Sequence, residues 1–227
     1  MIIIGHKDGS IEKASNARFT QKTKGYLTHT VIGGEFAVGK DDDNIAFKTL
    51  LGSCVAIMFY DKNIKIKGMN HFLLPKTDNS NDDMKYGLYS VEAMLNEMYK
   101  LGCSKSSMVA KISGGADIMQ LKFSSSNSIG FRNVEFAKDF CHSEGFKLIS
   151  EHTRGEHGRL ILLADEFQTF IKVTQKSETD SKIVQEEVNL QKEIQKAPVI
   201  KEYANGIDLF DVDKKIIIEP QMEIELF

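Results

Sequence analysis

Cysteine and histidine provide the first candidate for chemistry, because Cys54 and His71 fall in two apolar, β-branched stretches joined by a short turn. These stretches cover residues 49–61 and 64–74. A two-residue loop at Lys62-Asn63 predicts a β-hairpin in which Cys54 lies opposite His71, with Cβ atoms about 4.5–5.5 Å apart. The sequence therefore predicts a thiol and an imidazole within reach of each other.

Such a pair can act as a cysteine nucleophile. A free thiol has a pKa of about 8.5, and a neighbouring imidazolium lowers it towards neutral pH. Gly52 and Ser53 precede the cysteine, allow a close backbone approach, and could place N–H groups against an oxyanion. The alternative is that Cys54 is a small core residue and His71 a histidine satisfied by structural hydrogen bonds.

The length of the loop decides between these interpretations, because side chains alternate between the two faces of a strand. In the two-residue register one face is an apolar core surface, and the other is mixed and more accessible. The core face holds Val55, Ile57, Phe59, Ile64 and Ile66, and the mixed face Cys54, Ala56, Met58, Tyr60, Lys65, Lys67, Met69 and His71. One residue more or less would separate the thiol from the imidazole.

Two helices and further strands are expected around this hairpin. Apolar residues at helical spacing predict helices over 91–98, before Leu101-Gly102, and over 134–141, before Gly145. Short apolar runs predict strands at 108–112, 147–149, 159–164 and 169–173, with a candidate strand at 2–4. The fold class is therefore α+β or α/β with a mixed sheet.

Composition excludes several classes of protein. The 227 residues, 41% hydrophobic and 27% charged, suffice for one large domain with its own core. A net charge of −3 gives no electrostatic case for binding nucleic acid. No apolar run approaches the roughly 20 residues that span a bilayer, so membrane insertion is not expected. Three scattered cysteines without a CxxC pair favour free thiols in a reducing cytoplasm.

Neither a metal nor a cofactor is expected. His152 and His157 are five residues apart, which differs from the i, i+4 spacing of a helical zinc motif. Gly114-Gly115 is followed by no phosphate-loop signature and indicates a tight turn. Arg132-Asn133 opens the second helix, where a structural role is favoured over substrate contact.

Three segments are expected along the chain: an N-terminal extension at 1–27, a central domain at 28–173, and an acidic C-terminal tail at 174–227. Apolar positions within 181–196 predict an amphipathic helix in the tail. An I-[D/E]-L-F pattern follows at 207–210 and again at 224–227. Such segments dock by strand addition or by filling a pocket, so the tail is expected to dock another protein; the alternative is packing on its own domain.

Ordered sequence blocks run through the central domain: G-E-F-A-V at 34–38, T-L-L-G-S-C-V-A at 49–56, G-M-N-H-F-L-L-P at 68–75, Y-G at 86–87, A-K-I-S-G-G-A at 110–116, I-G-F-R-N at 129–133 and G-E-H-G-R at 155–159. In wording, order and spacing they resemble the motifs of the chemoreceptor glutamine deamidases, the CheD family of bacterial chemotaxis. The resemblance covers roughly residues 32–173.

This resemblance implies an α+β sandwich, with a mixed sheet and helices packed on one face, followed here by a C-terminal extension. It implies a cysteine hydrolase, a protein-glutamine glutaminase, that converts glutamine side chains of methyl-accepting chemotaxis receptors to glutamate through a thioester. Methylesterase side activity is also expected. Carried over to this sequence, Cys54 is the nucleophile, His71 the base, and Thr49 completes the triad by orienting His71.

The family also implies a partner besides the receptors, a phosphatase of the CheC type. The alternative function is a non-catalytic binding module that docks receptors or such a phosphatase. The presence of both Cys54 and His71 favours the enzyme.

Overall fold

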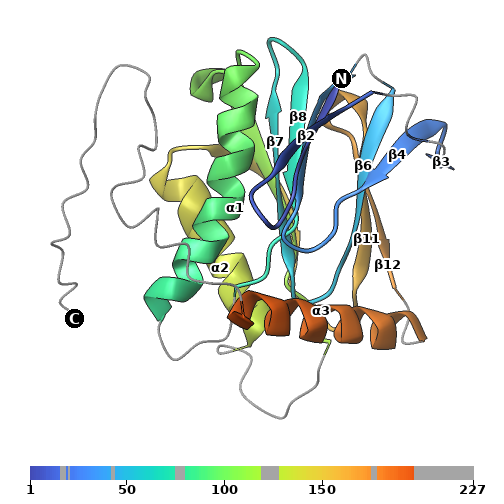
Figure 1. Ribbon diagram of the computed structural model, residues 1–227, viewed down its shortest axis with the longest axis vertical. Helices are drawn as coiled ribbons and strands as arrows, with labels where there is room; N and C mark the ends of the chain where they lie inside the picture. The colour runs from blue at the N-terminus through green and yellow to red at the C-terminus, as the bar shows by residue number, and fades with distance from the viewer. Residues whose placement is uncertain are drawn as a thin grey trace, which may run out of the picture. The chain divides into compact units, whose positions relative to one another are not determined.

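Two β-sheets lie at the centre of the part of the chain that the structure describes, residues 1–15, 19, 21–41, 44–74, 80–118, 128–174 and 178–196 of the computed structural model (Figure 1). The larger sheet contains, in spatial order, β10 (Lys147–Thr153), β9 (Met108–Gly114), β7 (Val55–Asp61), β8 (Ile66–Asn70), β5 (Phe36–Lys40), β1 (Ile2–Gly5) and β2 (Ile11–Ala14). The smaller contains β12 (Thr169–Val173), β11 (Arg159–Leu163), β6 (Ile45–Leu51), β4 (Tyr26–Thr30) and β3 (Lys22–Thr23).

Both sheets are mixed, as predicted, because β10 pairs parallel with β9 and β4 pairs parallel with β6, while their other neighbours run antiparallel. The four strands predicted between residues 108 and 173 are confirmed as β9, β10, β11 and β12. The candidate strand at 2–4 is confirmed as β1, which pairs with β5. The N-terminal segment thus extends the larger sheet.

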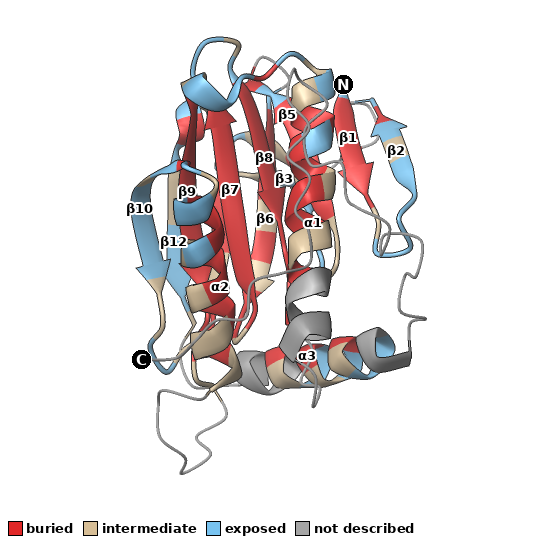
Figure 2. Ribbon diagram, turned by 90° about the vertical axis from the view of Figure 1, so that its left-hand side faces the viewer, coloured by how far each residue is buried: buried red, intermediate tan, exposed pale blue. Residues whose placement is uncertain are grey.

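Helices α1 (Ser80–Lys100) and α2 (Ile129–Ser143) cover one face of the larger sheet, as Figures 1 and 2 show. Both confirm the predicted helices, and both end where the sequence indicates. Gly102 and Gly145 have φ of +94° and +67°, a left-handed conformation that glycine adopts without steric cost and that ends helices. The fold is therefore α+β, with helices on one face of a mixed sheet.

The helix predicted at 181–196 is confirmed as α3 (Glu178–Lys196), which begins three residues earlier than expected. Residues 1–195 form one compact unit, so α3 up to Gln195 belongs to the same unit as the sheets. Figure 1 shows α3 lying across the ends of both sheets. The two I-[D/E]-L-F patterns lie outside the described residues, and none of the described helices is long and apolar enough to cross a membrane.

Two apolar cores hold the layers together. One lies between the helices and the larger sheet and includes Val55, Ile57 and Phe59. The other lies between the two sheets and includes Cys54 and Met58. The strand residues of β7 are buried on both faces (Figure 2). The expectation of a mixed, more accessible face is therefore wrong, because the smaller sheet covers that face.

Lys67 is a charged residue within the core between the two sheets. The sequence predicted that it would lie on an accessible face, in contact with water. Its side chain is fully buried, with Nζ 3.2 Å from Asp41 Oδ1 and in an ion pair with Asp165. Tyr60 donates a 2.8 Å hydrogen bond from its hydroxyl to Asp41. A buried ammonium is tolerated when carboxylates and hydrogen bonds compensate its lost hydration.

The single strand predicted over 49–61 is wrong, because two strands of different sheets occupy this segment. β6 ends at Leu51 in the smaller sheet and β7 begins at Val55 in the larger one. Residues 52–54 form the bend between them. The apolar run continues through the bend because both strands are buried, so the sequence pattern alone does not reveal the crossing.

The predicted hairpin register is also wrong, by two residues. The turn comprises four residues, 62–65, and pairs Tyr60 with Lys67 and Met58 with Met69. An isolated bridge between Val55 and Phe72 continues this register. Because the register is shifted by an even number of residues, each side chain stays on the face of the hairpin that was predicted for it. Cys54 and His71 are therefore diagonal neighbours on one face instead of directly opposed residues.

Candidate active site

A hydrogen bond joins two of the three side chains that the sequence singled out, Thr49 and His71, and the hairpin register puts Cys54 on the same face as His71. Cys54 lies in the bend between β6 and β7, Thr49 lies within β6, and His71 directly follows β8. Their exposed fractions are 1%, 0% and 8%. The candidate site is thus built where strands of both sheets end side by side, and it is buried.

Thr49 determines which nitrogen of His71 is free. The Thr49 hydroxyl donates to the Val31 carbonyl at 2.8 Å, and its oxygen lies 2.9 Å from His71 Nδ1. Because the hydroxyl proton is engaged with Val31, we assign the proton of this second contact to Nδ1. Nε2 then carries a lone pair, and it is buried without a hydrogen-bond partner among the described residues. The imidazole is therefore oriented as a base.

The protonation states differ from those expected for a thiolate–imidazolium pair. Burial lowers the pKa of His71 to about 4, despite the opposing hydrogen bond to Val31. The pKa of the Cys54 thiol is raised, chiefly by burial and then by the charge of Glu187. The expectation that an imidazolium keeps Cys54 ionised is wrong for this state, which contains a neutral thiol and a neutral imidazole.

Hydrogen bonds from neighbouring segments hold the bend by its carbonyl groups. Gly115 N–H donates to Cys54 O and Ala116 N–H donates to Gly52 O, each at 2.7 Å. Asn133 Nδ2 donates to Ser53 O, also at 2.7 Å. All three carbonyls of residues 52–54 thus bind groups from the end of β9 or from α2. This arrangement leaves the Cys54 N–H available for another partner.

Gly114 allows β9 to approach the bend this closely. Its φ is +120°, and a Cβ atom there would lie 2.2 Å from the Cys54 carbonyl oxygen. Both the backbone conformation and the available space therefore require glycine. The tight turn predicted at Gly114-Gly115 is wrong, because Gly114 is the last residue of β9 and the chain continues without a turn; the pair instead packs against the bend at residues 52–54.

Asn133 connects the two halves of the site. Besides donating to Ser53 O, it accepts a 2.9 Å hydrogen bond from Leu74 N–H through Oδ1, and its side chain is fully buried. It thus ties the bend before Cys54 to the segment that follows His71. The structural role predicted for Asn133 agrees with these contacts.

Replacing Asn133 with alanine is expected to lower the free energy of unfolding by about 2–4 kcal/mol, because two buried backbone groups would lose their partners. Urea titration measures this change. Asp139→Ala, an exposed position on the same helix, is the control and should unfold like the wild type. Equal midpoints for Asn133→Ala and the wild type would contradict the positioning role.

Sequence reasoning missed Glu187, which accepts a hydrogen bond from the Cys54 N–H of the bend. Glu187 Oε1 accepts a 3.0 Å hydrogen bond from Cys54 N–H, and Oε2 accepts a 2.7 Å bond from the Ser53 hydroxyl. The residue is buried although it belongs to α3. Its signal in the sequence was a glutamate four residues after Ile183 and three before Leu190, on the apolar face of the predicted helix.

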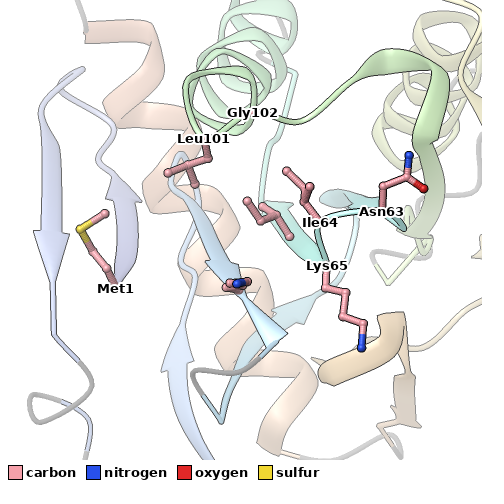
Figure 3. Close-up of a pocket in the computed structure, with 8 residues that line it drawn as sticks. Met1, Asn63, Ile64, Lys65, Leu101 and Gly102 are labelled. Atoms are coloured by element: carbon pink, nitrogen blue, oxygen red, sulfur yellow. The ribbon is translucent and has the colours of Figure 1, made fainter.

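A separate hollow lies at the opposite ends of β7 and β8, where Figure 3 shows Met1, Asn63, Ile64, Lys65, Leu101 and Gly102 around it. Lys40 and Ile66 complete its lining. The described lining holds no thiol, imidazole or carboxylate. This hollow therefore offers no group of the kind that the sequence predicts for catalysis.

Comparisons with known proteins identify the family of this chain. A family profile described as "CheD chemotactic sensory transduction" matches residues 73–173. A probable chemoreceptor glutamine deamidase CheD of Stenotrophomonas maltophilia (strain K279a) is 36% identical over 173 residues, covering 75% of this chain and 83% of the relative. The protein of the same name from Methanococcus vannielii is 40% identical over 133 residues, covering 58% and 84%. This chain belongs to the CheD family.

Proposed function

We propose that this protein deamidates glutamine side chains of methyl-accepting chemotaxis receptors in the cytoplasm, with Cys54 as nucleophile. The observation that carries the proposal is the Thr49–His71 hydrogen bond, which leaves a bare Nε2 on the imidazole at the end of the strand beside the cysteine. The names of its relatives supply the substrate class, since they are called chemoreceptor glutamine deamidases.

In the first half of the proposed reaction, His71 Nε2 takes the thiol proton of Cys54 and the sulfur attacks the carboxamide carbon of glutamine. The Cys54 N–H, and the backbone of Gly52 and Ser53 that holds it, would then face the developing oxyanion. Collapse of the tetrahedral intermediate breaks the C–N bond. His71 gives its proton to the leaving ammonia, and a thioester to Cys54 remains.

In the second half, His71 removes a proton from water, which attacks the thioester carbon. The C–S bond breaks, the thiol is restored, and the product is glutamate. Thr49 is a positioning residue in this scheme, because the hydrogen bonds of its hydroxyl, within the described part of the chain, join it to Val31 and to His71 Nδ1. Each step uses only groups of this chain and water.

Two finer parts of the proposal follow from the same chemistry and family. A thioester enzyme accepts any leaving group that it can protonate, so glutamyl methyl esters are proposed as a second substrate. A CheC-type phosphatase is proposed as a partner, and the C-terminal I-[D/E]-L-F patterns as a docking element for another protein.

The decisive experiment is mass spectrometry of receptor cytoplasmic fragments after incubation with the full chain. Hydrolysis of each amide to an acid adds about one dalton and releases one ammonia. The wild type and Glu187→Ala, which vacates the Cys54 N–H, are each compared with the same chain carrying Cys54→Ala. Identical receptor masses throughout, on several receptors, would reject the enzyme and favour the non-catalytic binding module.

A further inference from the structure

Three glycines from separate segments form the surface on which α3 lies. A Cβ atom on Gly33 would lie 2.3 Å from Leu190, and one on Gly158 would lie 2.6 Å from Ile183. One on Gly52 would lie 2.4 Å from Ile118 and 2.7 Å from both Ile183 and Glu187. Side chains at these positions would therefore push the helix away. The surface around the nucleophile bend is shaped to receive a helix at close range.

The helix contacts this surface through residues spaced as a docking helix requires. Ile183, Glu187 and Leu190 occupy positions i, i+4 and i+7, and all three are buried. The neighbouring Gln185 and Glu186 are exposed. Two aliphatic anchors around one central polar residue are the pattern of an amphipathic helix seated in a groove.

Glu187, the central residue of the three, binds the bend at residues 52–54. Both carboxylate oxygens of Glu187 accept hydrogen bonds at the nucleophile bend, one from Cys54 N–H and one from the Ser53 hydroxyl. A glutamate side chain at this N–H has the chemical identity of the product of glutamine deamidation. No other acidic side chain in the described part of the chain binds the Cys54 N–H.

We propose that α3 occupies the substrate surface of its own chain as a bound product would, with Glu187 in the place of the glutamate that deamidation forms. The inference rests on the proposed function and names its substrate class and its regulation. The substrate is a helix that carries glutamine, with aliphatic side chains four residues before and three residues after it. In the closed state α3 excludes that helix.

The attachment of α3 is suited to exchange with a substrate helix. Beyond the two aliphatic anchors and the two hydrogen bonds of Glu187, the described side chains of α3 add an exposed ion pair between Lys7 and Glu193. Both partners are about half exposed, and such surface pairs contribute little. A receptor helix that offers the same three contacts therefore competes with α3 for the same surface.

The sharpest test is the full chain carrying Glu187→Gln. If α3 lies as a substrate lies, Cys54 should attack the carboxamide carbon of residue 187, ammonia should leave, and water should hydrolyse the thioester to glutamate. Peptide mass mapping after purification should find a gain of about one dalton at residue 187, with most of the chain converted, because the reacting groups are already held together.

Two matched variants accompany this test. Glu186→Gln changes the same charge on the adjacent, exposed residue and should keep its amide. Glu187→Gln combined with Cys54→Ala should keep its amide as well, because the nucleophile is missing. Persistence of the amide at residue 187 in a chain whose Cys54 deamidates receptor fragments would overturn the inference while leaving the proposed function intact.

Alkylation of Cys54 tests the closed state without any reliance on deamidation. Glu187→Ala removes the carboxylate whose charge raises the pKa of the Cys54 thiol, so iodoacetamide should label Cys54 at least about tenfold faster than in the wild type. Glu186→Gln removes a charge that raises this pKa less than the charge of Glu187 does, so Cys54 should be labelled much more slowly in this variant than in Glu187→Ala. Equal rates in Glu187→Ala and the wild type would overturn the inference, even if no chain deamidated any receptor.

Discussion

Cys54→Ser is expected to lower the rate of glutamine deamidation by about 10³-fold or more. An alcohol is a much weaker acid than a thiol, so it depends on a strong base for activation. The base that the site offers is His71, whose pKa burial lowers to about 4. A base this weak can remove the proton of a thiol while the sulfur attacks the substrate, but it cannot activate the serine hydroxyl to a comparable extent.

Ammonia release from receptor fragments measures this loss, with Cys54→Ser and its parent both carrying Glu187→Ala so that the site is open. Cys103→Ser is the matched control. Cys103 is also buried, with a thiol pKa raised to about 12 by burial, but it lies after α1 and away from the bend. It should retain the parent rate. A serine variant that keeps more than about a tenth of the activity would remove Cys54 from the role of nucleophile.

His71→Gln is expected to reduce deamidation by about 10²–10⁴-fold, because no group would remain to accept the thiol proton and return it to ammonia. The same variant should change the acid dependence of folding. The pKa of His71 is about 4 in the folded chain against 6.5 for the free side chain. Between these values the unfolded chain binds a proton that the folded chain does not.

Wild-type stability should therefore fall as the pH drops from 6.5 towards 4, by about 3 kcal/mol from this residue, and the loss should level off below pH 4. Urea unfolding near pH 7 and near pH 4.5 measures the difference. His71→Gln should lose less stability over this interval than the wild type. His142→Gln, at an exposed position of α2, is the control and should follow the wild type. Parallel acid losses in all three chains would contradict a buried, neutral His71.

Much of the local structure was readable from the sequence, because the signals that define it are local. Both helix ends were predicted from Leu101-Gly102 and Gly145, because glycine adopts without steric cost the left-handed conformation that ends a helix. The strands β9 to β12 were predicted from apolar runs. Among the site residues, Cys54, His71 and Thr49 were named from a hairpin pattern and a family resemblance. The structure joins Thr49 to His71 by a hydrogen bond, and the hairpin register puts Cys54 on the same face as His71.

The arrangement of the site was decided by tertiary structure. The sequence predicted one continuous strand through residues 52–54, but the chain crosses there from one sheet to the other. The predicted accessible face was wrong because a second sheet, built from segments distant in sequence, covers it. The predicted hairpin register was wrong because a two-residue and a four-residue turn preserve the same alternation of side chains.

Glu187 is the clearest example of a site residue that only the tertiary structure reveals. The sequence determined that residues 181–196 form an amphipathic helix, because apolar side chains recur at helical spacing. Only the tertiary structure decided that this helix packs against the bend at Cys54, more than 130 residues away along the chain. The pairing depends on Gly33, Gly52 and Gly158, three residues without side chains that leave room for a helix. An absent side chain produces no hydrophobic or charge pattern, so this complementarity exists only in three dimensions.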